Sequence, residues 1–92
     1  MTINPDDVDT WYNKGVALQG LKKDEEAITC YDRAVTINPD DAGAWYRKGK
    51  AFHNLKKYKE AVHCYDHVLK IDPYHKEAQD NKMAALRSLR KK

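Results

Sequence analysis

The chain repeats itself at a fixed spacing. Pro5, Pro39 and Pro73 lie 34 residues apart, and residues 4–37 aligned without a gap on residues 38–71 give 18 identities. A fixed period of about 20 to 50 residues is typical of stacked repeat proteins, in which each unit contacts only its neighbours. The period therefore predicts a solenoid, and it favours a binding surface over a catalytic cleft.

Within each copy the apolar residues follow the period of a helix. In the first copy Trp11, Gly15 and Leu18 lie at i, i+4 and i+7, on one face of a helix. A second helical stripe in the same copy is formed by Ala27, Ile28, Tyr31, Ala34 and Val35. The second copy repeats both patterns, and no segment alternates at period two. We therefore predict two helices for each copy and no strand.

Polar turns separate the predicted helices. Residues 4–7 and residues 38–41 both read Asn-Pro-Asp-Asp. The residue before a proline is forced out of the α region, so the preceding helix ends there. An aspartate can then cap the next helix and offset its dipole.

A glycine lies inside the first helix of each copy, at Gly15 and Gly49. Glycine costs about 1 kcal/mol relative to alanine in a helix. We interpret both glycines as places where the partner helix approaches closely, and we expect Ala27 and Ala61 to face them. Replacing Gly15 with a larger residue should destabilise the domain by overpacking.

These residues resemble the tetratricopeptide repeat family. That family repeats every ~34 residues, with Trp, Leu, Gly and Tyr in the first helix and Ala, Phe, Ala and Pro in the second. The first copy matches at Trp11, Gly15, Leu18, Ala27, Tyr31, Ala34 and Pro39. The second copy matches at Trp45, Gly49, Phe52, Ala61, Tyr65, Val68 and Pro73.

Two positions depart from the family pattern in both copies. Lys14 and Lys48 replace a leucine, and Lys22 and Lys56 replace a glycine that is common in the turn. At the first pair we expect a half-exposed lysine whose aliphatic stem still packs. The second pair leaves the geometry of the turn open.

The resemblance implies an all-α, right-handed α-α superhelix of five helices, with two helical hairpins and a capping helix. We divide the single domain 1–92 into residues 1–7, which match the tail of a preceding repeat, repeats at 8–41 and 42–74, and a cap at 75–92. The match at the start indicates a fragment of a longer array or the loss of earlier repeats, and we favour a fragment.

The cap is predicted as one helix from about His75 to Arg90. Met83 takes the place that Gly49 has in the second copy, and a bulky residue is allowed because no partner helix follows. Its apolar side is predicted to comprise Ala78, Ala85, Leu86 and Leu89.

In the family, the first helix of each hairpin lines a concave face, so the resemblance implies where a groove lies. We predict a partner-binding site at Tyr12, Asn13, Val16, Tyr46, Arg47, Lys50, His53, Asn54 and Asn81. The same face should include Asp9, Glu77, Asp80 and Ala84. Tyrosine and arginine are common contact residues of interfaces. We expect a peptide or protein partner of acidic or mixed charge; the alternative is an ordinary solvated face.

Some family members clamp the C-terminal carboxylate of chaperone tails. They use lysine and asparagine on one first helix, asparagine on the next, and lysine and arginine on a third. The matching positions here are Tyr12, Val16, Arg47, Glu77 and Asn81. Because Glu77 would repel a carboxylate, we expect no binding of chaperone tails.

Charge is distributed unevenly along the chain. Residues 1–41 carry a net charge of −5 and residues 42–92 a net charge of +8. The basic half favours an acidic partner. It also allows electrostatic binding of nucleic acid, an alternative that we favour less because the bases are not interleaved with exposed aromatic residues in a stacking platform. The opposite charges of the two ends predict a weak, salt-sensitive, head-to-tail self-association.

The sequence contains no constellation that indicates catalysis, a metal or a cofactor. Cys30 and Cys64 are 34 residues apart, too far in stacked repeats for a disulfide, and are predicted to be small buried thiols. His63 and His67 lie one helical turn apart, but third and fourth ligands are not evident, so we predict that both are exposed residues on the outer face. There is neither a phosphate loop nor a nucleophile paired with a base.

We therefore predict a non-catalytic scaffold or adaptor that binds a partner segment on its concave face. The alternative is a structural or self-associating element of a longer array. No segment approaches the ~18 apolar residues of a membrane span. The first residues do not resemble a secretory signal, which favours the cytoplasm.

Overall fold

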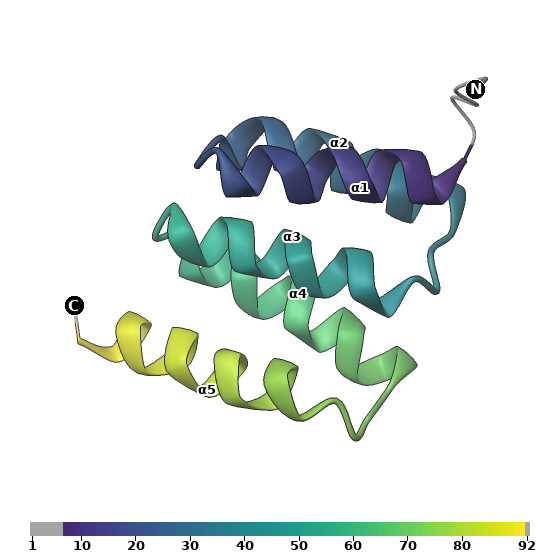
Figure 1. The fold of residues 1–92 in the computed structure, drawn as a ribbon. Helices are drawn as coiled ribbons and strands as arrows, with labels where there is room; N and C mark the ends of the chain where they lie inside the picture. The colour runs from purple at the N-terminus through teal and green to yellow at the C-terminus, as the bar shows by residue number, and fades with distance from the viewer. Residues whose placement is uncertain (1–6, 92) are drawn as a thin grey trace.

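The computed structural model describes residues 7–91, and within this range it contains five α-helices and no strand. The helices are α1 (Val8–Gly20), α2 (Asp24–Ile37), α3 (Ala42–Asn54), α4 (Tyr58–Ile71) and α5 (Lys76–Arg90). The first four form two antiparallel hairpins, α1–α2 and α3–α4, and α5 adds a third level to the stack (Figure 1). The predicted helix count, the two hairpins and the final single helix are confirmed.

The first helix of each level begins at a side-chain cap. Asp7 accepts a hydrogen bond from the backbone N–H two residues later at 2.9 Å, and Asp41 accepts one from the Ala44 N–H at 3.2 Å. At α5 the cap is His75, whose Nδ1 accepts from the Ala78 N–H at 3.1 Å. The predicted aspartate caps are confirmed, and histidine supplies the acceptor at the third level.

Each hairpin turns at a lysine in the left-handed backbone region. The φ angle is 61° at both Lys22 and Lys56. The Lys23 N–H donates to the Leu18 carbonyl at 2.8 Å, which closes the end of α1 as a Schellman motif. Residues with a Cβ adopt this conformation at a cost of about 1–2 kcal/mol. The turn is therefore one that glycine would favour, although lysine occupies it in both repeats.

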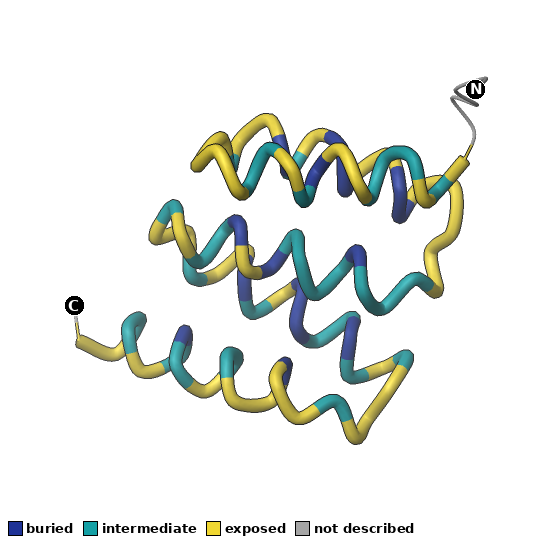
Figure 2. The backbone as a smooth tube through the Cα atoms, in the orientation of Figure 1, coloured by how far each residue is buried: buried dark blue, intermediate teal, exposed yellow. Residues whose placement is uncertain are grey.

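The core is built from small side chains and two large rings. The fully buried large side chains include Tyr31 and Tyr65, each 0% exposed. Buried residues face the inside of each hairpin and the contacts between levels, and exposed residues cover the outside (Figure 2). Cys30 and Cys64 are both buried and free, as predicted.

The two helical glycines lie directly against the tyrosine rings. A Cβ atom added at Gly15 would lie 2.5 Å from Tyr31 Cε1, and one added at Gly49 would lie 2.7 Å from Tyr65 Cε1. Real Cβ atoms do not approach a ring carbon so closely, because the two atoms would overlap. The tyrosine ring already fills the space beside each glycine. The predicted close approach at both glycines is confirmed.

The residue that faces each glycine differs from the prediction. Ala27 and Ala61 are fully buried, but the nearest atoms to the glycines belong to Tyr31 and Tyr65. Each tyrosine lies four residues after the alanine, one turn along the same face of the helix. Its longer side chain reaches the space that the glycine leaves.

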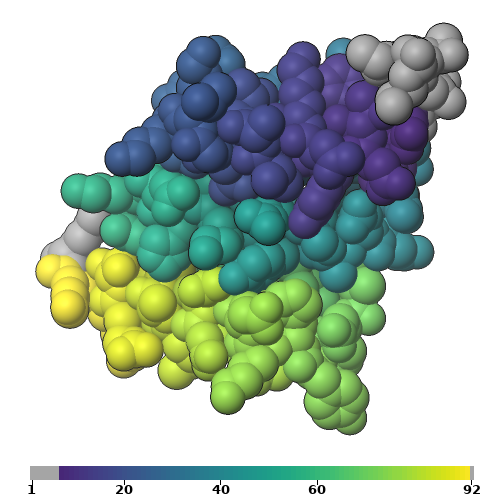
Figure 3. All heavy atoms as spheres, viewed as in Figure 1, coloured from purple at the N-terminus to yellow at the C-terminus, as the bar shows by residue number. Residues whose placement is uncertain are grey.

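The same ion pair joins successive levels. Lys48 Nζ lies 2.6 Å from Asp32 Oδ1, and Lys82 Nζ lies 2.6 Å from Asp66 Oδ1. The side chain of Lys48 is 17% exposed, which confirms the predicted packing of its stem, whereas Lys14 in the first level is exposed. Figure 3 shows the three levels packed against one another without a gap on the face in view.

A side-chain hydrogen bond holds the loop before each of the last two levels. The Trp45 Nε1–H donates to the Pro39 carbonyl at 2.9 Å, and the Gln79 amide donates to the Pro73 carbonyl at 2.8 Å. Gln79 is the counterpart of Trp45, 34 residues later. As predicted for a cap, Met83 of α5 is 53% exposed.

We predict that Gly15→Ala lowers the free energy of unfolding by about 1–3 kcal/mol, because its methyl group would overlap the Tyr31 ring. Gly20→Ala is the matched control. Gly20 lies in the same helix with nothing within 4 Å of an added Cβ, so alanine should stabilise by up to about 1 kcal/mol. Urea unfolding of the two variants measures both effects, and equal stability of the two would contradict the Gly15 contact.

Candidate partner-binding face

Two equivalent hydrogen bonds connect the first helices of successive levels. Arg47 Nε donates to the Tyr12 hydroxyl at 3.4 Å, and Asn81 Nδ2 donates to the Tyr46 hydroxyl at 2.9 Å. In both pairs the partners are 35 residues apart. These contacts join α1, α3 and α5 into one continuous face, which we call the first-helix face.

The predicted site residues fall into a half-buried and an exposed group. The half-buried residues are Tyr12, Val16, Tyr46, Arg47, His53 and Asn81. The exposed residues are Asn13, Lys50 and Asn54. Among the other predicted groove residues, Ala84 is half-buried, and the acidic ones, Asp9, Glu77 and Asp80, are exposed. The inner group fixes the helices, and the outer group is available to a ligand.

Two of the predicted site residues make their contacts near the hairpin turns. The Asn54 amide donates to Asp24 Oδ1 of α2 at 3.4 Å. The His53 ring packs edge-on against Tyr58, with 5.2 Å between the ring centroids. The structure therefore does not bring this pair into the Tyr12–Arg47 cluster.

Positive charge is concentrated at the middle of the first-helix face. Lys50 Nζ lies 6.0 Å from the centroid of the Tyr46 ring, a cation–π distance. The guanidinium of Arg47 is charged, as in any arginine, and the hydrogen bond to Tyr12 raises its pKa further. Arg47 and Lys50 are three residues apart on α3, which places both cations on one side of the helix.

Gln19 is a structural contributor that the predicted site lacks. Its Oε1 accepts a hydrogen bond from the buried Tyr31 hydroxyl at 2.5 Å, and its amide donates to the Arg47 carbonyl at 3.4 Å. His53 has this position in the second repeat, and the buried Tyr65 hydroxyl has no hydrogen-bond partner within residues 7–91. The only sign of this hydrogen bond in the sequence is that Gln19 of the first repeat is matched by His53 in the second.

We predict opposite outcomes for removal of the two buried hydroxyls. Tyr31→Phe leaves Gln19 Oε1 without its donor and should lower the free energy of unfolding by about 0.5–1.5 kcal/mol. Tyr65→Phe removes a buried hydroxyl without a partner and should be neutral or stabilising. Denaturant unfolding compares them, and a larger loss for the Tyr65 variant would contradict this assignment.

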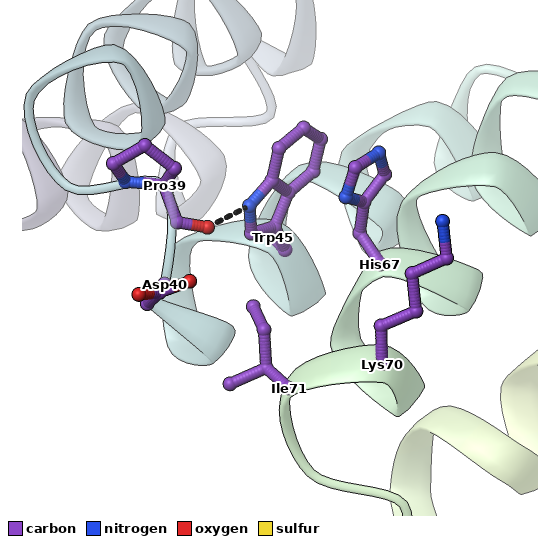
Figure 4. Close-up of a pocket in the computed structure, with 6 residues that line it drawn as sticks. All are labelled: Pro39, Asp40, Trp45, His67, Lys70 and Ile71. Carbon is purple, nitrogen blue, oxygen red and sulfur yellow. Dashed lines mark hydrogen bonds between the residues drawn. The ribbon is translucent and has the colours of Figure 1, made fainter.

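An open hollow of about 600 Å³ lies between the start of α3 and the end of α4 (Figure 4). The Trp45 and His67 rings stack in it, with centroids 4.0 Å apart and planes 4° apart. The prediction that His63 is exposed is confirmed, but the same prediction for His67 is wrong, because its ring stacks on Trp45 and the residue is half-buried. At the matching place in the first repeat, the Arg33 guanidinium lies 5.6 Å from the centroid of the Trp11 ring. The hollow is lined by Pro39, Asp40, Trp45, His67, Lys70 and Ile71.

The environment of His67 disfavours its charged form. Burial lowers its pKa from the usual value, and the nearby His63, Lys70 and Lys48 lower it further. Asp66 acts in the opposite direction but is already paired with a lysine. The part of the chain that the structure describes has no group of three or more His, Cys, Asp or Glu residues suited to a metal ion.

We predict that the domain loses stability in mild acid through His67. Because the folded state lowers the pKa of His67, the unfolded chain binds more protons below pH ~6.5, and stability falls with pH down to the folded pKa. His67→Gln should lose less stability than wild type between pH 7.5 and 5.0, because its side chain takes up no proton when the chain unfolds. Urea unfolding at each pH tests this, and an unchanged dependence for the His67 variant would contradict it.

The fold and this face define an α-helical repeat protein. The family model of the tetratricopeptide repeat matches residues 8–41 and 42–75, and the chain therefore belongs to the tetratricopeptide repeat family. No curated protein matches the chain in a sequence comparison. Among residues 7–91, none of the helices is long and apolar enough to cross a membrane.

Several solved tetratricopeptide repeat structures resemble the chain. The first TPR domain of Spaghetti (RPAP3), bound to the HSP90 peptide SRMEEVD, is 29% identical with a TM-score of 0.91, covering 94% of this chain and 68% of that one. The Arabidopsis OM64 TPR domain is 26% identical with a TM-score of 0.86, covering 89% and 68%. The TPR2B domain of yeast Sti1, in complex with pHsp70, is 25% identical with a TM-score of 0.85, covering 90% and 71%.

Proposed function

We propose that this protein is a non-catalytic interaction module that binds an extended peptide or partner segment along the first-helix face. The observation that carries the proposal is the pair of hydrogen bonds from Arg47 to the Tyr12 hydroxyl and from Asn81 to the Tyr46 hydroxyl. They fix the inner side chains of three helices, so the outer polar side chains are presented from a rigid base. Preorganisation of this kind reduces the conformational entropy that is lost on binding.

The exposed side chains determine what the face can recognise. The amide of Asn13 can donate to and accept from a peptide backbone, and Lys50 can pair with a carboxylate. Arg47 adds a second cation one turn away. Glu77 and Asp80 on α5 place negative charge at one edge of the same face. We infer a partner segment of mixed charge, with an acidic residue at α3 and a basic residue toward α5.

The related structures support peptide binding but not the same peptide. The RPAP3 domain is bound to an HSP90 tail peptide, and the Sti1 domain is in a complex with pHsp70. This chain has Tyr12, Glu77 and Asn81 at positions where tail-binding members place lysine or arginine. We therefore infer that it takes a different segment, in keeping with the role of a cytoplasmic scaffold or adaptor.

We predict that peptides selected from a displayed random library bind the wild-type protein and lose about tenfold or more in affinity with Lys50→Glu. The exposed Lys59 of α4 lies outside the first-helix face, and Lys59→Glu makes the same change of charge. It should leave the affinity nearly unchanged. Fluorescence anisotropy with labelled peptides measures each dissociation constant.

The same assay with SRMEEVD distinguishes this proposal from the binding of chaperone tails. We expect no binding at micromolar concentration, because the carboxylate would meet Glu77. Tight binding of this peptide would overturn the inferred partner. Equal loss of affinity in the Lys50 and Lys59 variants would show that binding depends on net charge rather than on the first-helix face.

A further inference from the structure

The exposed surface of the first level contains one half of the contact that joins the other levels. Lys48 and Lys82 each pair with an aspartate of the level before. Lys14 has the same position in α1, and within residues 7–91 it forms no ion pair with a carboxylate. Its side chain borders a hollow of about 270 Å³ together with Leu18 and Glu26. We call Lys14, Leu18 and Glu26 the entry face.

At the opposite end of the stack no second helix follows α5 within the described residues, so α5 itself supplies the charge that Lys14 can meet, in place of an aspartate on a second helix such as Asp32 or Asp66. Along α5 an acidic, an apolar and a basic residue follow one another at Asp80, Met83 and Arg87. All three are exposed, and Met83 is 53% exposed although it lies where the two repeats have a buried glycine. Spacings of three and four residues place them on one side of the helix. We call this row the exit face.

We propose that the entry face of one copy of this chain docks on the exit face of a second copy. Lys14 then meets Asp80, Leu18 meets Met83, and Glu26 meets Arg87. This contact shares only Asp80 with the first-helix face and needs no partner segment, so the mass of the protein alone tests it independently of the function proposed above.

The order of charges selects one orientation of the two copies. Glu26 lies near the start of α2, beside Leu18 at the end of α1, so with α1 of one copy parallel to α5 of the other each charge meets its opposite. The antiparallel placement brings Lys14 against Arg87 and Glu26 against Asp80, and like charges repel. Figure 1 shows that α1, α3 and α5 run in the same direction through the stack. Parallel docking therefore continues the direction of the existing levels.

The charge of the chain as a whole favours the same arrangement. Residues 1–41 have a net charge of −5 and residues 42–92 a net charge of +8, so the entry end of one copy attracts the exit end of another. The two faces differ, and the contact is therefore heterologous and can add further copies in a row. Exposed ion pairs contribute little and are screened by salt, so the association is weak.

Sedimentation velocity at 20 mM and 500 mM salt, over protein concentrations from 10 μM to 1 mM, tests the proposal. The average mass should rise with concentration at low salt and return to that of a monomer at high salt. K14E and D80K should each weaken association about three- to tenfold. An equimolar mixture of the two variants, or the double variant K14E/D80K, should restore it because each charge again meets its opposite.

K59E and D40K make the same changes of charge at exposed positions outside both faces and should associate as wild type does. A monomer at every concentration in low salt would overturn the proposal. Association that K14E and D80K leave unchanged would also overturn it, as would a failure of their mixture to associate. Circular dichroism shows whether each variant keeps its helices, and Lys14 and Asp80 are exposed, so a loss of fold is not expected.

Discussion

The contact between a tyrosine ring and a glycine backbone sets the distance between the two helices of each hairpin. Tyr31 lies over Gly15 and Tyr65 lies over Gly49, with no space for a Cβ atom at either glycine. The contact determines how α1 meets α2 and how α3 meets α4. The positions of Tyr12 and Tyr46 depend on it in turn, since each packs against the ring beneath it, with centroids 6.0 and 6.1 Å apart. The first-helix face is therefore a consequence of hairpin packing.

Much of this fold is predictable because the 34-residue period repeats every signal twice. A glycine in a helix is ambiguous when it occurs once, but Gly15 and Gly49 together indicate a packing requirement. The caps at Asp7 and Asp41 are equally direct, since they are local interactions between near neighbours in the sequence. The predicted site also includes the residues that join the helices, because they lie at matched positions of successive first helices.

The features that sequence reasoning missed depend on how far a side chain extends and on which neighbouring side chain it packs against. The spacing of Ala27 and Gly15 does not show that the Tyr31 ring extends between the helices. His67 has the position of an outer-face residue. Only the position of the Trp45 ring in the structure shows that His67 stacks on it. Lys22 lies where the family often has a glycine in the turn, but lysine itself does not indicate a positive φ angle. The closing hydrogen bonds of the turn hold it in that conformation.

The two repeats are alike in backbone and differ in how polar groups are satisfied. Gln19 completes the hydrogen bond of Tyr31, whereas His53 turns toward Tyr58 and leaves Tyr65 without a partner in the described chain. Arg33 and His67 cover their tryptophans with different chemistry. Differences of this kind leave the packing intact, so they can change recognition or acid sensitivity in one repeat alone.

The bond from Gln79 to the Pro73 carbonyl separates two roles that Trp45 combines. Trp45 holds its loop through the indole N–H and packs its half-buried ring against the core, whereas Gln79 keeps only the donor at nearly the same distance, 2.8 Å against 2.9 Å. The hydrogen bond that holds the loop before a level therefore forms whether or not a second helix packs on that level. A stack of this kind can be lengthened or ended by changing side chains on one helix, while every joint along the chain keeps the same form.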